Sequence, residues 1–202
     1  MKKYFFNILM LMFLLFSLTA CGFNTEEQTD KAQQTADTAS KSEVKQEVKN
    51  VPENLLKKYN MDSRFILVNK TEFKVYAIDA TGKILAVYPC ALGKNSGQKE
   101  KEGDMKTPSG TFTIDEIIDA SSWTHDFKDG KGEIAGAYGP WFISLDTFNL
   151  SKGEWGGIGI HGTHDPSSMG TRVSEGCIRL TNDNIQKLKV FAKVGMKVVI
   201  IE

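Results

Sequence analysis

The sequence has no net charge and contains little cysteine, histidine or proline. Its 202 residues include three cysteines, three histidines and five prolines, and 25 basic side chains balance 25 acidic ones. A nucleic-acid-binding domain shows a concentrated basic stripe and a high isoelectric point, so this balance excludes that class and we expect no nucleic-acid partner. No Cys-x-x-Cys pair is present, which removes a common signature of a zinc site.

The sequence also lacks an apolar run long enough to cross a bilayer. Two lysines precede the run Tyr4–Leu18, which has about 15 residues where roughly 20 are needed. A basic start, a short apolar run and small residues before a cleavage point describe a secretory signal, which we assign to residues 1–20. The Leu-Thr-Ala-Cys sequence ending at Cys21 resembles a bacterial lipobox, which implies an extracytoplasmic lipoprotein held to the cell membrane by lipid on Cys21. An uncleaved membrane anchor is the alternative and places the domain on the same side.

The composition changes twice after Cys21. Residues 21–50 are rich in Glu, Gln, Thr, Lys, Asp and Ala and contain one aromatic side chain, too little apolar area to offset the entropy lost on ordering. We expect a lipidated, disordered tether there, with a reach of about 30 Å. A helix in its second half is the alternative, but Pro52 would end it. Residues 51–63 predict a short helical lead-in, and residues 64–202 have the length of one domain with a single core.

The pattern of this domain is mainly that of β-strands. Runs of β-branched and aromatic residues alternate with Asn-Lys-Thr-Glu and Asp-Ala-Thr-Gly turns. Only Asn182–Val194 has good helical character, with Gly195 as its stop. We therefore predict a mainly β domain with one helix near its end. The expected strands are residues 65–68, 73–78, 84–92, 111–118, 141–145, 156–160 and 197–201.

His161 and Cys177 form the candidate reactive centre. They lie sixteen residues apart, and the glycines at 162, 170 and 176 allow close approach of a substrate to the backbone. An imidazole can take the proton of a thiol and leave a nucleophilic thiolate. His161 also follows an apolar strand-like segment and precedes a Gly-Thr pair, as expected for a catalytic group at the end of a strand.

The residues around Cys177 suit acyl transfer. Gly176 leaves room for a substrate carbonyl, and the backbone N–H groups near the thiol could stabilise a developing oxyanion. Ser174 adds a hydroxyl and Arg179 a fixed cation. An arginine fork binds carboxylates in two-point geometry, so Arg179 is expected either to hold a substrate carboxylate or to lower the pKa of the thiol.

A zinc site is the chemical rival of this interpretation. His161, His164 and Cys177 could supply three ligands, with Asp165 or Glu175 as a fourth, and zinc accepts such a mixture. The His-Gly-Thr-His spacing, however, matches no common ligand motif. We therefore expect no metal.

Other candidate residues carry weaker signals. Cys90 lies in the apolar run Ile84–Leu92, and we predict that it packs in the core rather than forming a disulfide. His164 is expected to be solvated or to line a substrate site, and His125, in a polar segment, receives no role. Residues 119–138 are long and polar, so they form either a lid over a cleft or an ordinary surface excursion.

Three ordered motifs resemble the L,D-transpeptidase catalytic domain, or YkuD family. That family has a histidine, a spacer of roughly fifteen residues, then Ser/Thr-His-Gly-Cys, an apolar residue and Arg or Asn. This chain has His161 followed by Ser174-Glu-Gly-Cys-Ile-Arg, together with Thr107-Pro-Ser-Gly-Thr-Phe and Tyr138-Gly-Pro-Trp. The resemblance extends from about residue 64 to the C-terminus. Glu175 departs from it, because the family usually has a second histidine there.

The resemblance implies a barrel- or sandwich-like catalytic domain and a monomeric cysteine acyltransferase that acts on peptidoglycan stem peptides without any cofactor. Cys177 would form a thioester with His161 as base, and the amine of another stem would resolve it as a 3→3 cross-link. The carbonyl of Gly162 or Thr163 would fix the His161 tautomer. We expect Glu175 on the acceptor side, attracting an ammonium group. Two alternatives remain open: an L,D-carboxypeptidase, in which water resolves the thioester, and a non-catalytic wall-binding lipoprotein.

Overall fold

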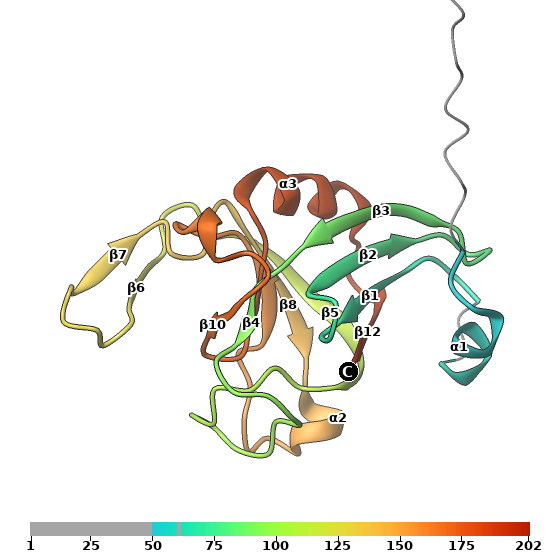
Figure 1. Ribbon diagram of the computed structural model, residues 1–202, viewed down its shortest axis with the longest axis horizontal. Helices are drawn as coiled ribbons and strands as arrows, with labels where there is room; N and C mark the ends of the chain where they lie inside the picture. Colours follow the sequence, from blue (N-terminus) through green and yellow to red (C-terminus); the bar gives the residue numbers. More distant parts are fainter. Residues whose placement is uncertain (1–49, 60–61) are drawn as a thin grey trace, which may run out of the picture. The chain divides into compact units, whose positions relative to one another are not determined.

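The computed structural model describes residues 50–59 and 62–202 (Figure 1). The predicted signal sequence, Cys21 and the predicted tether up to residue 49 lie outside the described residues. Within the described part, no helix is both long and apolar enough to cross a bilayer. The described chain begins with α1 (Glu53–Lys58), in the segment where the sequence predicts a short helix.

An eight-stranded sheet is the centre of the domain. Its order is β11-β9-β8-β5-β12-β1-β2-β3, and neighbouring strands are antiparallel except for the parallel pairs β12–β1 and β11–β9. The sheet curls in Figure 1 but stays open, with β11 and β3 as its edges, so the prediction of a mainly β, barrel-like domain is confirmed. The strands are β1 (Phe65–Asn69), β2 (Lys74–Ile78), β3 (Ile84–Pro89), β5 (Gly110–Asp119), β8 (Trp141–Asp146), β9 (Gly159–His161), β11 (Ile178–Arg179) and β12 (Lys197–Ile201).

Strands β12 and β1, neighbours inside the sheet, are covered on both faces. The sequences of β1 and β12 are apolar at successive positions, as suits strands that are buried on both sides. Ile66 and Val68 belong to the larger apolar cluster, together with residues of α3 (Asn182–Phe191). Phe65 and Leu67 point to the other face and join the cluster against which α1 packs. Alternation along one strand therefore supplies both cores.

Helix α3 (Asn182–Phe191) follows the candidate cysteine, as predicted, but it is shorter than predicted. Its first turn is capped by Thr181, whose Oγ1 accepts the Asn184 N–H at 3.3 Å. The prediction that it extends to Val194 is wrong, because Ala192 has extended backbone and Gly195 turns with φ of +81°. This early stop returns the chain directly to β12.

Short elements surround the sheet. They are β4 (Leu92–Gly93), which pairs with β10 (Arg172–Ser174), then α2 (Phe148–Ser151) and the 3₁₀ turn η1 (Pro166–Ser168). The sequence did not predict α2 or η1 because each is only about one turn long.

Cys90 is free and fully buried, as predicted. Burial raises the pKa of its thiol to about 12.

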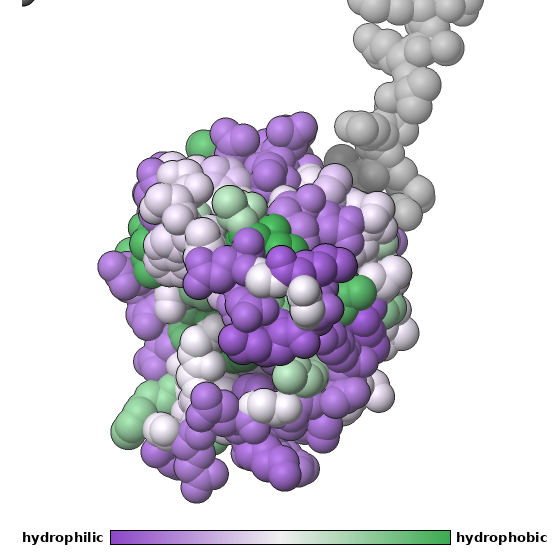
Figure 2. All heavy atoms as spheres, turned by 90° about the vertical axis from the view of Figure 1, so that its left-hand side faces the viewer, coloured by the Kyte–Doolittle hydropathy of each residue, from purple (hydrophilic) through white to green (hydrophobic). Residues whose placement is uncertain are grey.

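Residues 119–138 form a β-hairpin that projects from the sheet at the left of Figure 1. Its strands are β6 (Thr124–Asp126) and β7 (Glu133–Ala135). The face of the domain seen in Figure 2 from this side is mostly hydrophilic. Trp123, His125 and Phe127 recur at every second position, so they share one face of the hairpin. That face is directed at the candidate site.

Candidate active site

Strand pairing brings the predicted pair together. β9 ends at His161, and Cys177 immediately precedes β11. The two strands are parallel, with Arg179 opposite His161. Cys177 is two residues before Arg179, so the period of a strand directs all three side chains to one face. They line a common cavity of about 40 Å³.

The imidazole of His161 is buried and neutral. Its Nδ1 lies 2.7 Å from the Gly162 carbonyl oxygen, and its ring stacks on Phe142 and packs against Tyr138. Burial lowers the pKa of His161 to about 3, although the carbonyl groups of Gly162 and Tyr138 favour the protonated form. The ring is therefore unprotonated near neutral pH and able to accept a proton.

The thiol of Cys177 is also neutral. Burial raises its pKa to about 11, against the opposing effects of the Gly159 N–H group and the Arg179 cation. The cysteine is only partly buried, and it borders both cavities of the site. Its sulfur donates to the Gly157 carbonyl at 3.3 Å, so within the described residues the thiol and His161 share a cavity without a hydrogen bond between them. A hydrogen bond to the imidazole would require the thiol to give up its bond to the Gly157 carbonyl.

The raised pKa of Cys177 predicts a late onset of alkylation. In the full-length protein, the rate of carbamidomethylation of Cys177 by iodoacetamide should still increase above pH 9, because only the thiolate reacts and its fraction grows up to the pKa. Peptide mapping by mass spectrometry separates this residue from Cys21 and Cys90. A rate that levels off below pH 8 would mean a stabilised thiolate and would contradict the prediction.

Ser174 and Gly176 shape the turn that presents the sulfur. The hydroxyl of Ser174 donates to the Cys177 carbonyl at 2.6 Å and accepts the Gly176 N–H at 3.1 Å. Gly176 has φ of +141°, and a Cβ there would lie 2.9 Å from the Lys106 carbonyl oxygen, so a side chain is excluded. The Gly176 N–H already bonds to Ser174. Of the backbone N–H groups near the thiol, that of Cys177 is therefore the better candidate for the oxyanion donor.

Gly162 and Thr163 hold the loop after His161. A Cβ on Gly162 would lie 2.4 Å from Oδ1 of Asn182, and the Thr163 N–H donates to that same oxygen at 2.9 Å. The Gly162 carbonyl is thus fixed as the acceptor for the imidazole. Asn182 was missed by sequence reasoning, because the first residue of a helix carries no signal for a partner twenty residues away.

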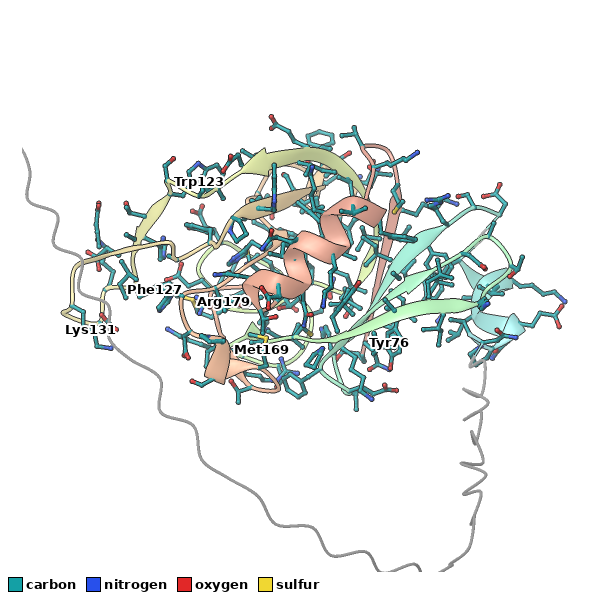
Figure 3. The ribbon with its side chains drawn as sticks, turned by 90° about the horizontal axis from the view of Figure 1, so that it is seen from above. Tyr76, Trp123, Phe127, Lys131, Met169 and Arg179 are labelled. Carbon is teal, nitrogen blue, oxygen red and sulfur yellow. The ribbon has the colours of Figure 1, made fainter. Side chains whose placement is uncertain are left out.

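Arg179 is a buried cation without a hydrogen-bonding partner. It is 6% exposed, its Nε has neither a partner nor solvent contact, and its side chain makes no hydrogen bond to the described residues. The guanidinium lies 4.9 Å from the centre of the Phe127 ring, and Figure 3 shows the two side by side. Burial lowers the pKa of Arg179, while Cys177 and Glu175 counteract this. An anionic group in the small cavity would satisfy it.

Glu175 has a partner that the sequence did not reveal. Its Oε2 lies 3.2 Å from Nε2 of His125, whose Nδ1 lies 3.0 Å from the Tyr138 hydroxyl. His125 comes from β6, and the alternation of Trp123, His125 and Phe127 was the signal that could have placed it in the site. The sequence placed Glu175 on the acceptor side without naming a partner in the chain, and the structure pairs it with His125.

A larger cavity adjoins the small one and shares part of its lining. It has a volume of about 510 Å³. Cys177, Glu175 and Tyr138 border both this cavity and the smaller one. The amine of Lys99 is held by Asp104 at 2.8 Å, so its charge is compensated. The aromatic walls are Trp123, Tyr138, Phe142 and Trp155.

The side chains considered as zinc ligands in the sequence do not form a metal site among the described residues. Among the described residues, no three His, Cys, Asp or Glu side chains are placed to hold one ion. His164 packs against the ring of Phe127, with 5.4 Å between ring centres. The Asp165 carboxylate accepts the backbone N–H of Ser167 at 3.2 Å.

Comparison with known proteins agrees with the motifs. A family model described as the L,D-transpeptidase catalytic domain, YkuD, matches residues 63–200. Two Bacillus subtilis proteins named as L,D-transpeptidases are similar. YqjB is 32% identical over 137 residues, which are 67% of this chain and 70% of YqjB. YkuD is 29% identical over 127 residues, which are 63% of this chain and 60% of YkuD. The chain thus matches only part of each relative's length.

Solved structures share the fold. The catalytic domain of an Enterococcus faecium L,D-transpeptidase aligns with a TM-score of 0.51 and 18% identity, covering 70% of this chain and 98% of that domain. Bdellovibrio bacteriovorus Bd1075 aligns with a TM-score of 0.50 and 26% identity, covering 76% of this chain and 51% of that one. The agreement with the E. faecium domain extends over nearly its whole length.

Proposed function

This chain belongs to the YkuD family of L,D-transpeptidase catalytic domains, and we propose that it forms 3→3 cross-links between peptidoglycan stem peptides through a thioester on Cys177. The observation that carries this proposal is that one thiol lines both a large aromatic cavity and a small cavity, whose cation Arg179 makes no side-chain hydrogen bond to the described residues. The large cavity has room for a peptide chain, and the small one, at about 40 Å³, suits a group of the size of a carboxylate.

Arg179 explains how a stem that ends in a free carboxylate is recognised. A carboxylate in the small cavity would pair with the guanidinium fork in two-point geometry. With the terminal carboxylate held there, the carbonyl of the preceding residue would lie near the sulfur, because Cys177 lines the same cavity. A peptide amidated at its C-terminus keeps its shape but loses this charge, so it serves as the matched control for Arg179.

The acylation step uses the neutral pair. Cys177 rotates towards His161, its sulfur attacks the carbonyl carbon of the third stem residue, and the imidazole takes the thiol proton as the C–S bond forms. The Cys177 N–H supports the oxyanion. The C–N bond to the terminal residue then breaks, and the imidazolium returns the proton to the leaving amine. A thioester and a free D-amino acid result.

Incubation of the full-length protein with disaccharide tetrapeptides, followed by mass spectrometry of the products, tests the function. We expect a dimer whose mass equals two tetrapeptide units minus one free D-amino acid, and slower consumption of the amidated control. Tripeptide units without dimers would establish the L,D-carboxypeptidase instead. Unchanged tetrapeptides would refute both, and would leave wall binding without catalysis.

We further propose that the protein is a lipoprotein of the cell membrane, supported by the lipobox-like sequence that ends at Cys21. Two acyl chains give stable anchoring where one is marginal. Cys21→Ala should release the protein from membranes or leave its signal sequence uncut, as seen by fractionation and by intact mass. Normal processing and membrane retention of this variant would contradict the proposal.

A further inference from the structure

The ring of His125 connects the Tyr138 hydroxyl to the carboxylate of Glu175, two residues before the nucleophile Cys177. If the Tyr138 hydroxyl donates to Nδ1, the proton of a neutral imidazole is on Nε2 and is donated to Glu175. One tautomer therefore satisfies all three side chains. The His125 ring is also packed edge-on against Phe127 and Tyr138, at centroid distances of 4.5 and 5.6 Å, which restricts its orientation.

This contact restrains a side chain that would otherwise be free. The Glu175 side chain is 40% exposed, and within the described residues its Oε1 makes no hydrogen bond. His125 holds the other oxygen, so the carboxylate stays at the junction of the two cavities beside the sulfur of Cys177. Without the Nε2–H group, several rotamers would be open to Glu175.

The charge at this junction suits an ammonium group. Glu175 and Glu102 face the large cavity, and the one lysine among its lining residues, Lys99, is already paired with Asp104. Four aromatic rings complete the walls, and aromatic faces attract cations. A protonated amine on an apolar stem would meet both a carboxylate and aromatic faces there. It would meet no uncompensated cation from the lining of that cavity.

We propose that His125 is a positioning residue that fixes the Glu175 carboxylate for capture of the acceptor amine, and that it thereby favours transfer to an amine over hydrolysis. This inference rests on the proposed function. The captured ammonium group first loses a proton. The amine nitrogen then bonds to the acyl carbon, the C–S bond breaks, and the second proton passes to the departing thiolate. The products are the new amide, the Cys177 thiol and one released proton.

The ratio of amine transfer to hydrolysis is the quantity to measure. It is determined after the thioester has formed, so it does not depend on the acylation rate or on the fraction of folded enzyme. The probe is Nα-acetyl-lysine as a cationic acceptor, with a stem tetrapeptide as donor. Hydroxylamine, largely uncharged in mildly alkaline buffer, serves as the neutral acceptor. Release of the terminal D-residue without acceptor reports acylation separately.

His125→Phe keeps a ring but removes the donor, and Glu175→Gln removes the charge. Each should lower the transfer ratio for Nα-acetyl-lysine by about tenfold, as expected for loss of a charge-assisted contact, with little effect on hydroxylamine. His125→Gln retains an N–H donor and should recover most of the ratio. Lys131→Ala, at the far end of the hairpin in Figure 3, is the matched control and should behave as wild type.

An equal loss with both acceptors in His125→Phe would overturn the proposal, because it would indicate a general disturbance of the site. So would an unchanged ratio for Nα-acetyl-lysine, or a failure of His125→Gln to recover any of it. If wild-type protein releases no D-residue at all, the proposed function fails instead, and the two failures are therefore distinguishable.

Discussion

Cys177→Ala is expected to abolish covalent modification of this protein by a carbapenem, whereas the wild type should gain one carbapenem mass on Cys177. The strained β-lactam carbonyl resembles the acyl donor, and the thiol stands in the cleft where such a carbonyl would lie. Removal of a catalytic nucleophile costs at least about 1000-fold in rate, so release of the terminal D-residue should also fall to background.

Intact-mass spectrometry and peptide mapping check this expectation. Cys90→Ala is the matched control, because Cys90 is fully buried and its removal should leave the adduct in place. An adduct of equal yield on Cys177→Ala, or none on the wild type, would show that the nucleophile is misassigned. Loss of the adduct in Cys90→Ala would require a folding check before it could be attributed to chemistry.

The central sheet could be predicted from the sequence because burial leaves a simple pattern there. β1 and β12 are continuous apolar runs, and their bounds lie close to the predicted ranges. The strands of the β6–β7 hairpin have only three residues each, and all three in β6 are polar, so they could not be told from a loop. The end of α3 was misplaced for a related reason: Val194 continues the apolar pattern, but Ala192 has already left the helix.

The parts of the site that lie within local sequence motifs could be predicted. Gly176, Ser174 and Cys177 lie in one turn, and strand pairing adds His161 and Arg179. The contact between His125 and Glu175 was not predictable in the same way, because alternation can assign His125 to one face of a strand but does not identify its partner. The ionisation of Cys177 was also beyond the sequence, because a nearby arginine predicts a lowered pKa whereas burial, which only the fold reveals, outweighs it.

Because His161 and Cys177 are both neutral, the thiol needs a base, and His161→Gln is expected to slow acylation strongly. Glutamine retains a donor for the Gly162 carbonyl but cannot accept the thiol proton and then carry it to the leaving amine. Loss of a general base typically costs about 100- to 10,000-fold, and we expect a decrease of that size in the rate of carbapenem acylation near neutral pH.

The pH dependence of that loss separates proton transfer from simple structural damage. His161 has a pKa of about 3, so the wild-type base is available throughout the neutral and alkaline range. In His161→Gln, the thiol must ionise on its own, and its pKa of about 11 leaves a thiolate fraction that grows about tenfold per pH unit well below that value. The deficit of the variant should therefore shrink steadily from pH 7 to pH 10 when acylation is followed by stopped-flow absorbance. A deficit that stays constant over this range would place His161 in support of the fold rather than in proton transfer, because a misfolded cleft gains nothing from a more basic solution.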